Sequence, residues 1–125
     1  MTTQELANQL VALCREGKYE QVYKELFSED VWSIEPEGTP GGKVKGLAAI
    51  QKKGEEWSAM IETVHSSHIG DPIVADNYFA CAWSFKATMK GSSAPMEMEE
   101  ICLYHVQDGK IVSEQFFYTP APQYA

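Results

Sequence analysis

The chain is poor in basic residues, and it has no long apolar run. Its 125 residues contain 10 lysines and arginines against 18 aspartates and glutamates, which gives a formal net charge of −8. This balance argues against a nucleic-acid partner, because phosphates require a basic surface. No run approaches the roughly 18 apolar residues that span a membrane, so we expect no membrane association either.

The chain also contains few cysteines. The three cysteines, Cys14, Cys81 and Cys102, are an odd number without CxxC spacing. That pattern does not indicate a disulfide framework or a zinc site, and we interpret all three as buried free thiols. The amino terminus has neither a basic segment nor an apolar leader, so we expect a cytoplasmic protein. No metal or other cofactor is predicted.

Glycine and proline, at 9 and 6 residues, are too few for a disordered chain, and the 44% of hydrophobic residues suffices for a core. A chain of this length is expected to form a single domain over residues 1–125. Apolar residues at helical spacing predict helices over 2–16, 19–27 and 47–61. Runs of β-branched and aromatic residues predict strands over 31–35, 64–75, 78–90 and, as a hairpin, 98–118.

The predicted order is thus ααβαββββ, with the helices in the N-terminal half. Three helices cannot cover both faces of such a sheet, so we expect an α+β fold in which a strongly bent antiparallel sheet wraps over them as a cone. The outer sheet face would stay apolar at Ile101, Leu103 and Phe117, which predicts a homodimer through that face. Residues 37–46, with four glycines, form a predicted loop that is long enough to act as a lid over the cone.

Strand alternation determines which side chains point into the cone. In the predicted strand 78–90, the inner side carries Phe79, Cys81, Trp83, Phe85, Ala87 and Met89. If Asp76 and Asn77 form a two-residue turn, His68 lies opposite Phe85 and points inward, unless a bulge occurs near residues 70–72.

The hairpin over 98–118 has two possible registers. A two-residue Asp108-Gly109 turn puts Cys102 opposite Gln115, whereas a three-residue loop puts Cys102 opposite Glu114. We favour the three-residue loop, because it is common in hairpins and agrees with the resemblance described below. It gathers on one face Met98, Glu100, Cys102, Tyr104, Glu114, Phe116 and Tyr118. Glu35, Glu100, Glu114 and His68 would then all face one apolar cavity.

The order of elements, the Ile34-Glu35-Pro36 end of the first strand and the Asp108-Gly109-Lys110-Ile111 hairpin resemble the nuclear transport factor 2-like superfamily over essentially the whole chain. Its members include ketosteroid isomerases and SnoaL-like polyketide cyclases. In the isomerases an acidic residue before a proline is the general base, and the resemblance implies this role for Glu35. Their two oxyanion donors correspond to Leu10 and Cys102 here. Steroid isomerisation is therefore not expected, and the SnoaL-like group fits better.

The predicted function is binding of a small hydrophobic molecule, with cofactor-free isomerase, lyase or cyclase chemistry on a carbonyl compound. Glu35 would abstract a proton, and Glu100 or His68 would return it or hold the substrate oxygen. The ligand would be lined by Trp57, Trp83, Phe85, Cys102, Glu114, Phe116 and Tyr118. Two alternatives stay open: a non-catalytic binder with the same cavity, and a dimeric interaction module whose cone is filled by its own side chains. For each acid, the competing interpretation is a solvated surface carboxylate.

Overall fold

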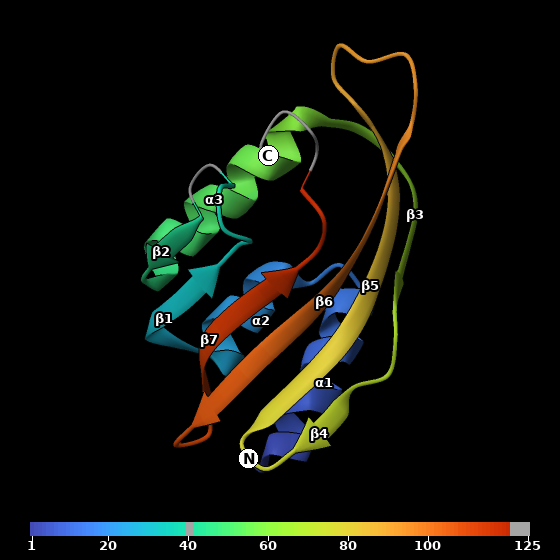
Figure 1. Ribbon diagram of the computed structural model, residues 1–125. Helices are drawn as coiled ribbons and strands as arrows, with labels where there is room; N and C mark the ends of the chain where they lie inside the picture. Colours follow the sequence, from blue (N-terminus) through green and yellow to red (C-terminus); the bar gives the residue numbers. More distant parts are fainter. Residues whose placement is uncertain (40–41, 121–125) are drawn as a thin grey trace.

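The computed structural model describes residues 1–39 and 42–120, and in these ranges three helices lie against a strongly curved sheet that does not close (Figure 1). The helices are α1 (Thr3–Arg15), α2 (Tyr19–Leu26) and α3 (Leu47–Met60). The strands are β1 (Phe27–Ile34), β2 (Lys43–Lys45), β3 (Ile61–Ile69), β4 (Ile73–Ala75), β5 (Tyr78–Met89), β6 (Met96–Gln107) and β7 (Lys110–Phe117). The predicted α+β cone is confirmed.

The sheet is mixed, and it contains more strands than the sequence predicts. Its order is β2-β1-β7-β6-β5-β3, with β4 paired to β5. Strands β1 and β7 run parallel, so the prediction of a wholly antiparallel sheet is wrong at this pair. The predicted loop over 37–46 contains β2, which pairs antiparallel with β1. Residues 40 and 41 of that loop lie outside the described residues.

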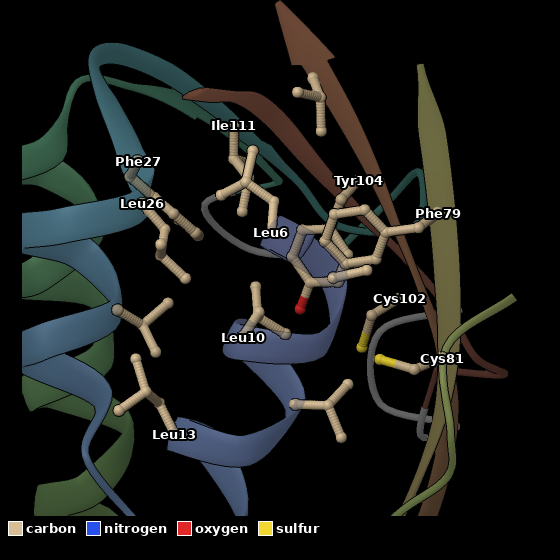
Figure 2. Packing of buried hydrophobic residues seen from close by; sticks show 14 of the residues in the cluster. Leu6, Leu10, Leu13, Leu26, Phe27, Phe79, Cys81, Cys102, Tyr104 and Ile111 are labelled. Carbon is tan, nitrogen blue, oxygen red and sulfur yellow. The ribbon is translucent and has the colours of Figure 1, made fainter. Parts of the chain in front are cut away.

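Helix α1 fills one part of the cone. Its capping box is present: the Thr2 hydroxyl accepts from the Glu5 backbone N–H at 3.1 Å, and the Thr2 N–H donates to the Glu5 carboxylate at 2.9 Å. Its apolar face, including Leu6 and Leu10, is buried against the sheet (Figure 2). Because this part of the interior is filled by core side chains, any accessible inner surface must lie farther along β5 and β6.

The predicted inward position of His68 is wrong. The Val74–Phe79 pair forms as expected, but His68 lies opposite Ser84 instead of Phe85. The register slips by one residue across the segment 70–72 between β3 and β4, which moves the last residues of β3, from Ser66 to Ile69, to the other face. His68 is consequently exposed on the outer side of the sheet.

The last hairpin places the predicted residues on the predicted face. Its register, however, is neither of the two registers that the sequence analysis considers. Asp108 and Gly109 form a two-residue turn, with φ angles of 51° and 74°. A bulge at Val112 then shifts the register, so that Cys102 lies opposite Phe116 and Tyr104 opposite Glu114. This pairing differs from the favoured one by two residues, which is one full period of strand alternation. Glu100 and Glu114 therefore share the inner face.

Candidate functional site

Glu35 follows the last residue of β1 and is held by two other parts of the chain. Its Oε1 atom lies 2.7 Å from the Nζ atom of Lys53 on α3, and only 14% of the Glu35 side chain is exposed. The Tyr118 hydroxyl, just beyond β7, donates to the Oε2 atom at 2.8 Å. Both carboxylate oxygens therefore have a partner, and Glu35 is not a solvated surface acid.

Lys53 is the residue of this site that the sequence interpretation missed. Its ammonium group also donates to the Ser33 hydroxyl at 3.1 Å, and it lies 5.5 Å from the centroid of the Phe116 ring. A signal for it exists, because Lys53 lies three residues after Ile50 and four before Trp57, on the same helical stripe as these two. A lysine within an apolar stripe points to a carboxylate partner across the interior.

Glu100 lies beside this ion pair on the inner face. It projects from β6 opposite Trp83, and the Cys102 thiol donates to its Oε1 atom at an Sγ–O distance of 3.6 Å. Burial, reinforced by the charge of Glu35, raises the pKa of Glu100 to about 7, although the Cys102 hydrogen bond and Lys53 act in the opposite direction. Glu100 thus holds a proton for part of the time at neutral pH.

Glu114 is the deepest of the three acids. It lies next to the fully buried Ser33 across the parallel β1–β7 pair, and only 7% of it is exposed. Burial raises the pKa of Glu114 to about 7, while hydrogen bonding to Ser33 and the charge of Lys53 oppose the rise. We call Glu35, Glu100, Glu114 and Lys53 the carboxyl cluster, because the charges of all four act on one another.

Aromatic side chains next to the carboxyl cluster are only partly covered. Trp57, Trp83, Phe85, Phe116 and Tyr118 are each half-buried, in contrast to the fully buried core over α1. The ring centroids of Trp57 and Phe85 are 6.2 Å apart, as are those of Trp83 and Phe85. The inner face of the sheet is therefore not sealed by its own side chains, and an apolar ligand could complete its burial there.

A depression of about 590 Å³ lies along the projecting part of β5 and β6. Phe85, Met98 and Tyr118 line it together with Thr119 and with the outward-facing Ser66, Ser84, Lys86, Glu97 and Glu99. Among the residues that the structure describes, Tyr118 alone belongs both to this lining and to the network around Glu35. The two acids with raised pKa values, Glu100 and Glu114, thus lie in the carboxyl cluster and do not line the depression.

The remaining predicted positions fall into two groups. Four predicted residues lie on the inner face as expected: Trp83, Cys102, Glu114 and Phe116. His68 lies on the outer face and is therefore not part of the site.

The described residues contain no group of three histidine, cysteine or acidic side chains arranged to hold a metal ion. Within residues 1–39 and 42–120, none of the helices has the length and hydrophobicity needed to span a bilayer.

Comparison with known proteins identifies the family. A model of the SnoaL-like domain matches residues 1–118. The chain belongs to the SnoaL-like family. A Mesorhizobium loti protein, provisionally described as a SnoaL-like polyketide cyclase and carbohydrate phosphatase, is 30% identical, with a TM-score of 0.88 over 94% of this chain and 100% of the other.

More distant structures share the SnoaL-like domain's fold. An NTF2-like protein of Burkholderia thailandensis has a TM-score of 0.82 at 12% identity, over 95% of this chain and 92% of the other. A Catenulispora acidiphila protein with a ketosteroid isomerase-like fold, in complex with trimethylamine, has a TM-score of 0.73 at 22% identity, over 94% and 88% of the two chains. Among proteins whose functions have been curated, none matches the chain.

Proposed function

We propose that this SnoaL-like protein binds a small hydrophobic carbonyl compound on its inner sheet face and moves a proton on it without a cofactor. The observation that carries the proposal is the contrast between two neighbouring acids. Glu35 forms an ion pair with Lys53, whereas Glu100 has its pKa raised to about 7 by burial. A site that pairs one carboxylate with an ammonium group and keeps a proton on a neighbouring acid for part of the time offers both a base and a proton donor.

In the proposed reaction, the Glu35 carboxylate takes a proton from the carbon next to the substrate carbonyl. The electron pair of that C–H bond moves toward the carbonyl oxygen, and the protonated Glu100 donates a hydrogen bond to the developing enolate. Glu35 then returns its proton to another carbon, which completes an isomerisation. Glu100 thus supplies the donor that is missing at Leu10 and Cys102, which are both buried core residues.

One related structure supports the ligand class. The Mesorhizobium loti relative, which is 30% identical, is provisionally described as a polyketide cyclase, and polyketides carry carbonyl groups. The half-buried Trp57, Phe85 and Phe116 supply apolar area for such a ligand.

We also propose a cytoplasmic location. The three free thiols, Cys14, Cys81 and Cys102, fit a reducing compartment.

The test is exchange of carbon-bound protons in deuterated water, followed by NMR over a panel of small apolar ketones and enones. A Glu35→Gln variant is expected to lose about a hundredfold in exchange rate, because the amide cannot accept the proton. Glu37→Gln is the matched control, since Glu37 is an exposed acid two residues away. Equal rates for the two variants on every compound that the wild type exchanges would refute the proposed role of Glu35.

A non-catalytic binder is the second candidate, and one observation favours it. Both oxygens of Glu35 are occupied, by Lys53 and by Tyr118, so one of these contacts must break before Glu35 can accept a proton from a substrate. The panel separates the two candidates. Binding of a compound that is retained in the Glu35→Gln variant, without exchange in the wild type, supports the binder.

We also propose that the protein forms a homodimer through the outer face of its sheet. Ile101 and Phe117 lie side by side on β6 and β7 and are 53% and 47% exposed. Ile101→Lys is expected to weaken the dimer by about 2 kcal/mol or more, because a charge would enter an apolar interface. Sedimentation velocity measures it, with Val64→Lys as the control at an equally exposed apolar residue on β3. A wild-type chain that sediments as a monomer at micromolar concentration contradicts the proposal.

A further inference from the structure

Two of the three cysteines meet on the inner sheet face. Cys81 on β5 and Cys102 on β6 are direct cross-strand partners. They are 5% and 2% exposed, and their sulfur atoms point toward each other in the core (Figure 2). The third cysteine, Cys14, belongs to helix α1 and has no such partner strand.

The backbone geometry of this pair brings the two cysteines within reach of a strained, easily reduced disulfide. The Val106 N–H donates to the Asn77 carbonyl at 2.8 Å, which identifies these opposite residues as a hydrogen-bonded pair. The register of β5 and β6 continues without a bulge, and hydrogen-bonded pairs recur every second residue, so Cys81 and Cys102 also form one. Such pairs have Cα atoms about 5.5 Å apart, which lies within the roughly 4.4–6.8 Å range of disulfides. Their Cβ atoms are also about 5.5 Å apart, which exceeds the usual disulfide separation of about 3.5–4.5 Å, so the bond would be strained and easily reduced.

We propose that Cys81 and Cys102 are a redox modification site, which a hydroperoxide converts into a reversible cross-strand disulfide. The Cys81 sulfur attacks the peroxide O–O bond and becomes a sulfenic acid, and the leaving oxygen departs as water or an alcohol. The Cys102 sulfur then displaces the sulfenic hydroxyl group, which leaves as water with the Cys102 proton. The two thiols are oxidised and the peroxide is reduced. This proposal does not depend on the proposed function.

The surroundings assign the first step to Cys81. Hydrogen bonding by Cys102 lowers the pKa of the Cys81 thiol, and Arg15 acts in the same direction, although burial and Glu100 oppose them. Burial raises the pKa of Cys14 to about 12, with Cys81 and Glu114 contributing, so Cys14 is the poorer nucleophile. The Cys102 thiol can donate to only one acceptor at a time, Cys81 or Glu100. A disulfide would take this donor away from Glu100.

The experiment treats the native full chain with dilute hydrogen peroxide, then counts free thiols and maps unreduced peptides by mass spectrometry. The expected result is a fall from three free thiols to one, a loss of two hydrogen masses, and a linked peptide pair containing Cys81 and Cys102. Dithiothreitol should restore all three thiols. Three thiols that stay free, or a linkage through Cys14, would overturn the proposal.

Two controls show that the fold selects the pair. A Cys14→Ser variant should fall from two free thiols to none at the wild-type rate. In urea, where the strands are separated, the same oxidation should link all three cysteines in mixed pairings. If the native chain gives the same mixture as the unfolded chain, the strand pairing does not direct the oxidation and the proposal is wrong.

Discussion

Replacing Lys53 by methionine is expected to lower the free energy of unfolding by about 3 kcal/mol at pH 8. Methionine keeps most of the aliphatic stem that packs near Phe116, so the change removes mainly the charge. Among the described residues, Lys53 is the only cation that forms an ion pair with an acid of the carboxyl cluster. Without it, Glu35 would remain as a largely buried charge beside two other acids.

Urea denaturation measures this effect, and three variants make it specific. Lys52→Met is the matched control, because Lys52 is the exposed neighbour on the same helix, and it should change little. Combining Lys53→Met with Glu35→Gln should recover part of the loss, since the orphaned charge is removed. If the two substitutions add without recovery, the ion pair does not stabilise the fold. The Lys53→Met loss should also shrink at pH 5, where Glu100 and Glu114 are protonated.

Glu114→Gln is expected to stabilise the protein at pH 8 and to flatten its stability profile. Burial raises the pKa of Glu114 from 4.5 to about 7, so the folded state binds a proton more tightly than the unfolded state. Stability from this proton is fully present below about pH 4.5 and is lost as the pH rises through about 7. At roughly 1.4 kcal/mol per pKa unit, one such group accounts for about 3 kcal/mol at most.

The measurement is the free energy of unfolding between pH 4.5 and pH 8 for the wild type and two variants. Glu99→Gln is the control, because it removes an equal charge from an exposed position on β6. The Glu114→Gln variant should exceed the wild type by about 2 kcal/mol at pH 8, since the amide removes the cost of ionising a buried acid. A stability difference between Glu114→Gln and the wild type that stays constant from pH 4.5 to pH 8 would show that folding does not raise the pKa of Glu114.

The sequence predicts the faces of the long strands because alternation needs only a register. Along β5, Phe79 and Cys81 are buried on the predicted side. Glu100 on β6 and Glu114 on β7 both face inward, as expected. The prediction fails where backbone irregularities intervene. The slip across residues 70–72 carries no residue signal beyond a glycine and a proline, and it alone moved His68 to the outer face.

Other parts of the site depend on contacts between distant segments, which a single sequence does not show. Lys53 and Glu35 are 18 positions apart on a helix and a strand end, so nothing local marks them as partners. The parallel pairing of β1 with β7, which brings Ser33 next to Glu114, joins segments from the two halves of the chain. The raised pKa of Glu114 follows from that packing, because burial is its largest cause.

The Asp108-Gly109 turn and the Val112 bulge together have a consequence for how chain length can vary in this family. The orientation of Glu114 is determined by the total number of residues that separate it from Cys102, whatever the shape of the turn. A relative with one residue more in the turn and no bulge would keep Cys102 opposite the equivalent of Phe116. One insertion alone would rotate the acid into solvent. Insertions and deletions in this hairpin should therefore occur in compensating pairs.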